Sequence, residues 1–154
     1  SPDFKGNLTH LDILLGSGLD VFSQNIETVE RLTRTVRDPR AGYDQTLRML
    51  SHSTKKGFVS KSGMMLGLGE QKNEVIQTMK DLFNSGVKIL TLGQYLRPTK
   101  NHLPVKNYIH PDEFKEYSDI GRKIGIEEVV AGPLIRSSYR ADRAFINLEK
   151  KKHG

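Results

Sequence analysis

The hydrophobic pattern of the chain alternates between helical spacing and short, continuous apolar runs. The segment NEVIQTMKDLFNSG repeats its apolar residues every three or four positions, which lines one face of a helix that ends at Gly86. Those residues are Val75, Ile76, Met79, Leu82 and Phe83. The run VKILTLG follows at once and is short, apolar and rich in β-branched residues, so it predicts a buried strand.

A similar helix and strand are predicted near the end of the chain. In PDEFKEYSDIGRKIG, Pro111 suits the first helical position and Gly125 suits the residue after the last turn. The apolar residues that share one face of this helix are Phe114, Tyr117, Ile120 and Ile124. The run IEEVVAG then predicts the last strand.

The remaining elements have weaker patterns. They are a helix over 8–15, a strand over 19–22, helices over 26–36 and 43–52, and a strand within FVSKSGMMLGLGE. Strands that alternate with helices indicate parallel β/α units, so the predicted fold class is α/β. The connection RPTKNHLPVKNYIHP is long for a compact domain, and such loops are usually functional.

Composition narrows the class of protein. With 154 residues, 36% of them hydrophobic and 27% charged, the chain fits one globular domain or part of one. No apolar run approaches the ~20 residues of a membrane span, and the start does not resemble a signal peptide. Because the chain does not begin with methionine, we expect it to be part of a longer protein. We expect no membrane partner.

The net charge of +6 raises the question of nucleic acid binding. The cations are spread along the chain, and the only basic block is KKKHG at the end, so a solvated surface is the favoured interpretation and no nucleic acid partner is expected. A basic face could equally attract an acidic protein.

Candidate nucleophiles and metal ligands are few. The chain has no cysteine, which excludes disulfides, thiolate metal sites and cysteine nucleophiles within it. His102 and His110 have no acidic partner at a metal-binding spacing, so surface or loop histidines are favoured. Ser137 and Ser138 lack the GxSxG context of a hydrolase, and on local grounds they are helix N-cap residues.

Each predicted strand runs into a polar or glycine-rich cluster: FSQNIET, GLGE, GQYLRPT and GPLIRSSY. In parallel β/α folds the carboxyl ends of the strands converge on the ligand site. Asn25 and Glu27 could hold a ribose, or they could begin a helix. The glycines of GMMLGLGE could admit a phosphate or adenine, or they could make tight turns. Gln94 and Tyr95 could face a cavity or cap the sheet.

Several motifs occur together in one order: PDFKG, QNIETV, VRDPRAGYDQTLRML, KSGMMLGLGE, LTLGQYLRPT, HLPV and AGPLIRSSY. From Pro2 to about Ala144 the chain resembles the C-terminal half of the lipoyl synthases, which belong to the radical S-adenosylmethionine superfamily. The resemblance implies a partial barrel of six β/α units. Residues 1–131 would form its last three units, and residues 132–154 a C-terminal extension with the RSSY motif and a basic tail.

The resemblance also implies cofactors. Two 4Fe-4S clusters would be held by cysteines outside this chain, and Ser138 would ligate one iron of the auxiliary cluster, leaving Ser137 as a cap. The residues implied for S-adenosylmethionine are Asn25, Glu27, Arg40, Gly63, Met65, Gly67 and Glu70. Gln24 stands where the family usually has histidine, so one hydrogen bond can be kept but the titrating nitrogen is lost.

The implied reaction is that of a sulfurtransferase in lipoate biosynthesis, which inserts two sulfur atoms at carbons 6 and 8 of a protein-bound octanoyl group. The partners would be an octanoylated lipoyl carrier domain (glycine cleavage H protein or the E2 component of 2-oxoacid dehydrogenases) and an electron donor such as ferredoxin or flavodoxin. The location would be cytoplasmic in a bacterium and mitochondrial or plastid in a eukaryote. We expect this chain alone to be inactive and marginally stable. The alternative is a cluster-free binding module for an adenine ligand or a lipoyl carrier domain.

Overall fold

The computed structural model describes residues 21–36 and 42–135. The helix predicted over 8–15, the first two residues of the strand predicted over 19–22, Arg40 and both serines of the RSSY motif lie outside these ranges.

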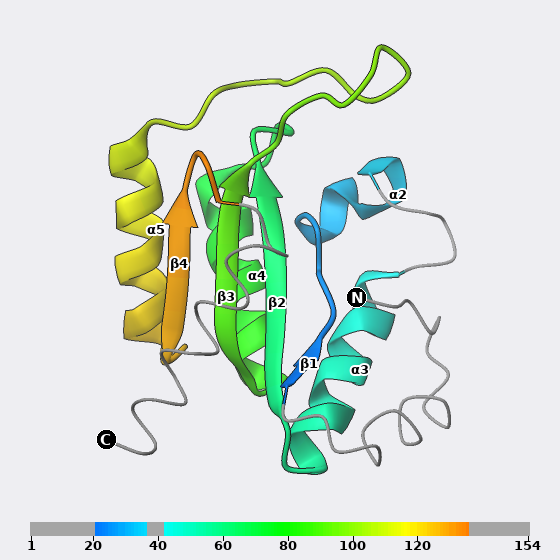
Figure 1. The fold of residues 1–154 in the computed structure, drawn as a ribbon, viewed down its shortest axis with the longest axis vertical. Coiled ribbons are helices and arrows are strands. Elements are labelled where there is room, and N and C mark those ends of the chain that lie inside the picture. Colours follow the sequence, from blue (N-terminus) through cyan, green and yellow to red (C-terminus); the bar gives the residue numbers. More distant parts are fainter. Residues whose placement is uncertain (1–20, 37–41, 136–154) are drawn as a thin grey trace.

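The centre of the fold is a four-stranded parallel sheet in the order β1-β2-β3-β4 (Figure 1). The strands are β1 (Val21–Ser23), β2 (Val59–Leu66), β3 (Val87–Gln94) and β4 (Glu128–Gly132). A helix connects each strand to the next: α3 (Tyr43–Lys55), α4 (Lys72–Asn84) and α5 (Pro111–Ile124). The predicted α/β class with parallel units is therefore confirmed for the described residues.

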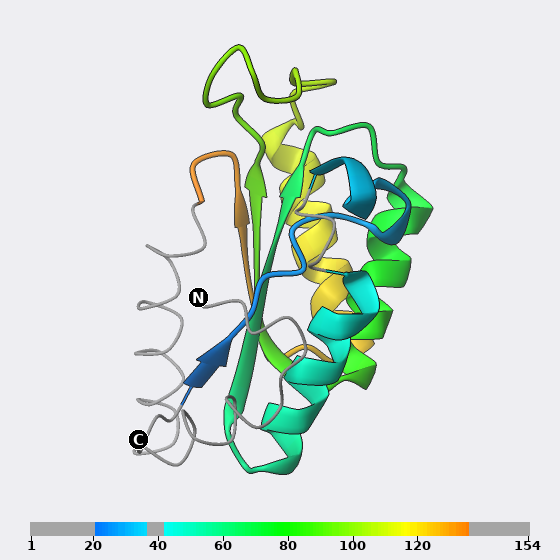
Figure 2. The same cartoon turned by 90° about the vertical axis from the view of Figure 1, so that its right-hand side faces the viewer.

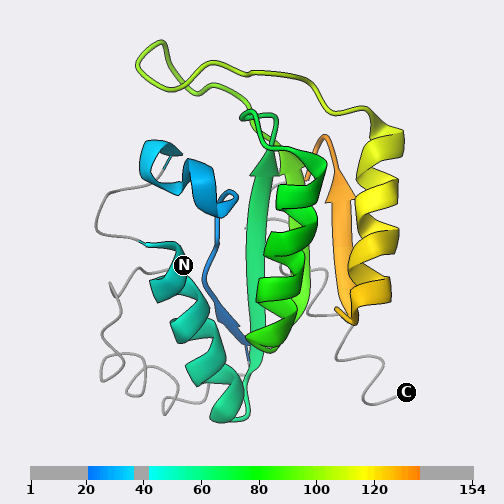
Figure 3. The same cartoon turned by 180° about the vertical axis from the view of Figure 1, so that it is seen from behind.

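All three long helices pack on one face of the sheet, as the edge-on and rear views show (Figures 2 and 3). Leu90 and Leu92 of β3 meet the apolar face of α4, where Met79 and Leu82 are also fully buried. Each such side chain contributes about 1.5–3 kcal/mol by leaving water. Because strand side chains alternate, every second residue points to the other face, which none of the described helices covers.

The ends of α5 follow the sequence prediction. Pro111 occupies the first turn, His110 Nδ1 accepts a hydrogen bond from the Asp112 backbone N–H at 3.0 Å, and Gly125 ends the helix with φ 129°. Positive φ costs glycine little, which explains why this residue ends the helix.

The helix predicted from Ile26 is wrong at its start. Helical structure begins only with the 3-10 turn η1 (Glu30–Leu32) and continues as α2 (Thr33–Val36). Before it, the chain stays extended beside β2: the Gln24 N–H donates to Lys61 O at 3.0 Å, and Glu27 bridges to Met64. Pairing with β2 overrides the local helical pattern, because those bonds satisfy the backbone groups in an extended conformation.

Candidate functional site

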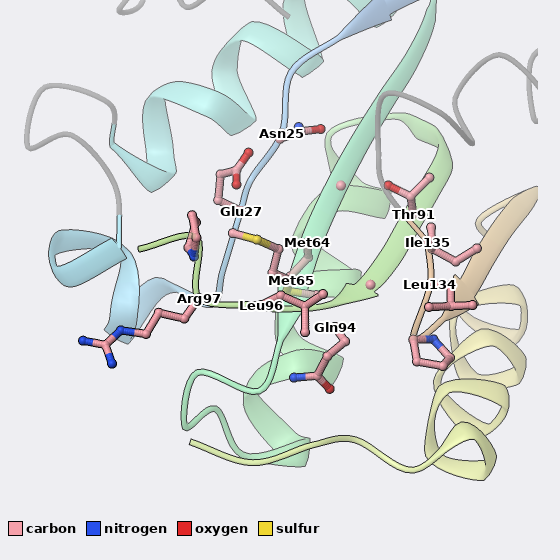
Figure 4. A pocket seen from close by; sticks show the side chains of 14 residues that line it. Asn25, Glu27, Met64, Met65, Thr91, Gln94, Leu96, Arg97, Leu134 and Ile135 are labelled. Atoms are coloured by element: carbon pink, nitrogen blue, oxygen red, sulfur yellow. The ribbon is translucent and has the colours of Figure 1, made fainter. Parts of the chain in front are cut away.

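A cavity of about 500 Å³ opens at the carboxyl ends of the strands, and three of the four post-strand clusters contribute to its wall (Figure 4). The lining residues are Asn25, Glu27, Gly63, Met64, Met65, Thr91, Gly93, Gln94, Leu96, Arg97, Pro98, Pro133, Leu134 and Ile135. The predicted convergence is thus confirmed for FSQNIET, GQYLRPT and GPLIRSSY but not for GLGE, whose preceding strand β2 lines the cavity in its place. The volume lies within the range of small-molecule sites.

Glu27 is held in a strained turn at the edge of this cavity. The Thr28 N–H donates to Ile26 O at 2.9 Å, which closes a three-residue γ-turn around Glu27, whose φ is 74°. Two further bonds tie Glu27 to β2, since its N–H donates to Gly63 O at 3.0 Å and its carbonyl accepts from the Met65 N–H at 2.9 Å. A non-glycine residue in this region costs about 1–3 kcal/mol and is typical of functional sites.

Asn25 lies two residues before Glu27 in the extended segment, and both residues line the cavity (Figure 4). The alternate residues, Gln24 and Ile26, are buried at 3% and 0% exposure, and the Ile26 N–H donates to the Ser62 hydroxyl at 2.9 Å. Asn25 and Glu27 therefore line the cavity and do not begin a helix. Gln24, at the position where the resemblance led us to expect histidine, is buried and is not among the residues that line the cavity.

One glycine that lines the cavity, Gly93, lies where the segment after β4 passes very close to β3. At Gly93, an added Cβ would lie 2.2 Å from Ile135 O in the segment that follows β4. Only a residue without a side chain permits this approach. The cavity wall made by Pro133, Leu134 and Ile135 therefore depends on Gly93.

Gly67 and Glu70, two predicted cofactor contacts, lie outside the cavity lining. The Glu70 carboxylate accepts from the Gly67 N–H at 2.9 Å and the Leu68 N–H at 3.0 Å, which shapes the turn after β2. Gly67 has φ 104°, and an added Cβ there would lie 2.3 Å from Gln94 Nε2. These contacts give both residues a structural role, while Gly63 and Met65 of the same motif do line the cavity.

Gln94 joins the cavity to the long loop over 95–110. Its Nε2 donates to Asn107 O at 3.1 Å and its Oε1 accepts from the Ile109 N–H at 2.9 Å. The Tyr95 hydroxyl donates to Leu103 O at 2.7 Å. Both residues thus fix the loop, which passes over the strand ends toward α5 (Figure 1). The sequence suggested that Gln94 and Tyr95 face a cavity or cap the sheet, but it gave no sign of their hydrogen bonds to the loop.

An ion pair between Arg31 and Glu74 stabilises the turn after β2. Arg31 Nε donates to Glu74 Oε2 at 2.8 Å, and the Arg31 guanidinium also donates to Gly69 O at 3.0 Å. The hydrogen bond from Arg31 lowers the pKa of Glu74 below its ordinary value, with help from the Gln71 N–H. The pair connects the segment after β1 to the start of α4 at the surface, where such pairs stabilise weakly.

Among the residues that the structure describes, no group of histidine, cysteine, aspartate or glutamate side chains could hold a metal ion. His102 Nδ1 lies 2.8 Å from the Thr99 hydroxyl, and His110 caps α5, in agreement with the loop interpretation. In the same part of the chain, no helix is long and apolar enough to cross a bilayer.

No family model matches the chain. Comparison with curated proteins finds relatives named lipoyl synthase. The relative from Marinobacter nauticus is 56% identical over 147 residues, 94% of this chain and 42% of that protein. The one from Thermus thermophilus is 52% identical over 153 residues, 98% of this chain and 47% of that protein. "Lipoyl synthase 1, chloroplastic" from Populus trichocarpa is 53% identical over 154 residues, 99% of this chain and 41% of that protein. The chain spans less than half the length of these relatives.

Proposed function

This chain carries the sequence of part of a lipoyl synthase, and we propose that it is the C-terminal half of one. The whole protein would insert two sulfur atoms at carbons 6 and 8 of a protein-bound octanoyl group. Residues 1–131 would complete a partial six-unit barrel and residues 132–154 would extend it. The observation that carries the proposal is that one cavity brings together Asn25, Glu27, Gly63 and Met65.

The cavity fits S-adenosylmethionine in size and chemistry. Its volume of about 500 Å³ suits a nucleoside joined to an amino acid. Asn25 and Glu27 offer donors and acceptors to ribose hydroxyls or to the methionine end, while Met65 and Leu96 offer apolar surface. When bound and cleaved by reduction, this cofactor supplies the radical that removes a hydrogen atom from the substrate.

The role of the chain's own residues is to hold ligands in place. The turn at Glu27 is fixed by hydrogen bonds on both sides, so its carboxylate needs little reorganisation to meet a ligand. The loop residues Leu96 and Arg97 and the segment around Leu134 border the opening, where they would limit the access of water to the reacting groups. We propose Gly67 and Glu70 as supports of the adenine-binding strand and Arg40 as a contact for the methionine carboxylate.

The described residues do not by themselves fit an iron-sulfur cluster, because the chain has no cysteine and these residues include no metal-binding group. We therefore assign no step to a cluster here. Ser138 remains our proposed ligand of an auxiliary 4Fe-4S cluster whose cysteines lie elsewhere. Its support is that Ile135, three residues earlier, lines the cavity.

The proposed substrate is an octanoylated lipoyl carrier domain, either the glycine cleavage H protein or the E2 component of a 2-oxoacid dehydrogenase. The loop over 95–110 beside the opening carries Arg97, Lys100 and Lys106 and no carboxylate. Tyr108 of this loop is 75% exposed. A basic loop with an exposed aromatic side chain suits an acidic protein surface.

The electron donor would be a ferredoxin or flavodoxin. The name of the poplar relative places that protein in the chloroplast. We propose the cytoplasm if this chain is bacterial, and a plastid or mitochondrion if it is eukaryotic. The comparisons do not favour the alternative of a cluster-free binding module.

Titration calorimetry with S-adenosylmethionine tests the cavity assignment directly. We expect the 154-residue chain to bind it and the Glu27→Ala variant to bind at least about 10-fold more weakly, because a hydrogen bond to a charged group is worth roughly 1.5–3 kcal/mol. Equal affinity of the two proteins would place the ligand elsewhere.

A further inference from the structure

Thr91 carries a buried hydroxyl that the fold does not use. The residue is 2% exposed, and its Oγ1 has no hydrogen-bond partner within residues 21–36 and 42–135. It lines the cavity, and Figure 4 shows its oxygen turned toward the side where Asn25 and Glu27 lie. A buried hydroxyl without a partner is destabilising, so its presence needs an explanation other than folding.

The neighbours of Thr91 leave space around this hydroxyl. Gly63 stands beside Thr91 in the register of β2 and β3, and Gly93 follows two residues later on the same face. Neither has a side chain that could cover or bond the oxygen. On the other flank, Val130 of β4 is paired with Thr91 and offers only methyl groups. The sheet therefore presents one polar group between two glycines and an apolar residue.

Packing alone would favour valine at this position. Valine has nearly the shape of threonine, favours strands equally well and leaves no polar atom unpaired. The hydroxyl contributes only if something that enters the cavity bonds to it. Because a hydroxyl both donates and accepts, it suits an oxygen or nitrogen atom of a polar ligand.

We propose that Thr91 is a ligand-binding residue, whose hydroxyl donates a hydrogen bond to an acceptor atom of S-adenosylmethionine across the cavity from Asn25 and Glu27. This inference rests on the proposed function, because it takes its ligand from there. It adds a contact from β3 to those implied on β2 and on the segment after β1.

The test compares the unaltered chain with Thr91→Val in two measurements. Without ligand, thermal unfolding should show a melting temperature about 2–4 °C higher for Thr91→Val, since an unpaired buried hydroxyl is removed. In calorimetry with S-adenosylmethionine, the same variant should bind about 3- to 10-fold more weakly. A control is Thr78→Val on α4, because the Thr78 hydroxyl is also buried but accepts a hydrogen bond from the Tyr43 hydroxyl at 3.3 Å and lies outside the cavity lining. It should lower the melting temperature and leave the affinity unchanged.

A lower melting temperature for Thr91→Val would overturn the inference, because the hydroxyl would then have a structural partner. Equal affinity for S-adenosylmethionine in Thr91→Val and the unaltered chain would also overturn it, while leaving the proposed function intact. If the unaltered chain binds no S-adenosylmethionine, the cofactor assignment fails and the inference fails with it.

Discussion

At Glu27 we predict that glycine stabilises the chain relative to alanine, although glycine usually destabilises a fold. At φ 74° any residue with a Cβ is strained by about 1–3 kcal/mol, whereas glycine adopts this conformation freely. Glycine also loses about 0.5–1 kcal/mol more conformational free energy on folding than alanine does. Glu27→Gly should therefore be more stable than Glu27→Ala by about 0.5–2 kcal/mol, the difference between these terms.

The comparison of glycine with alanine isolates the backbone, because neither variant keeps the carboxylate. Urea unfolding monitored by circular dichroism measures the difference as a shift in the midpoint at constant slope. Both variants should lose affinity for S-adenosylmethionine to the same extent. If Glu27→Ala is as stable as Glu27→Gly, or more stable, the turn is not strained at Glu27.

Three further substitutions test other parts of the site. Gly93→Ala should lower the melting temperature by at least about 4 °C, because its methyl would lie 2.2 Å from a backbone carbonyl; an unchanged melting temperature would contradict the close crossing. Glu74→Gln should remove a stabilising interaction that is fully present at pH values above 4.5, the ordinary pKa of glutamate. This interaction is lost as the pH falls through the lower pKa that Glu74 has in the folded chain. Unfolding at several pH values checks this, and the effect should become smaller in an Arg31→Ala background, where only the Gln71 N–H still donates to the Glu74 carboxylate. Lys106→Glu should slow association with an acidic carrier domain, most strongly at low salt. Lys88→Glu should not, because Lys88 is near the start of β3 and the loop follows the end of that strand. Equal association rates for the two variants would show that the loop does not bind the carrier domain.

Local signals predicted much of the fold. The apolar spacing in α4 and α5 and the roles of Pro111 and Gly125 follow from short-range rules, and the structure agrees with them. The convergence of three of the four polar clusters also followed, because parallel strands place their carboxyl ends at one edge.

Features that depend on contacts distant in sequence could not be predicted in this way. The helix predicted over 26–36 includes Ile26 and Glu27, but bonds to β2 keep this part of the chain extended. Gln94 holds a loop whose partners lie 13 and 15 residues ahead. Nothing local to Thr91 distinguishes an ordinary strand threonine from one with an unpaired hydroxyl.

The central claim is that this chain supplies half of a lipoyl synthase. A chimera tests it most directly, in which this chain replaces the matching 153 residues of the Thermus thermophilus relative. We predict that the reconstituted chimera inserts sulfur into an octanoylated H protein, as mass spectrometry would show, and that Glu27→Ala in the chimera abolishes the insertion. A folded chimera that contains both clusters but neither cleaves S-adenosylmethionine nor inserts sulfur would contradict the account.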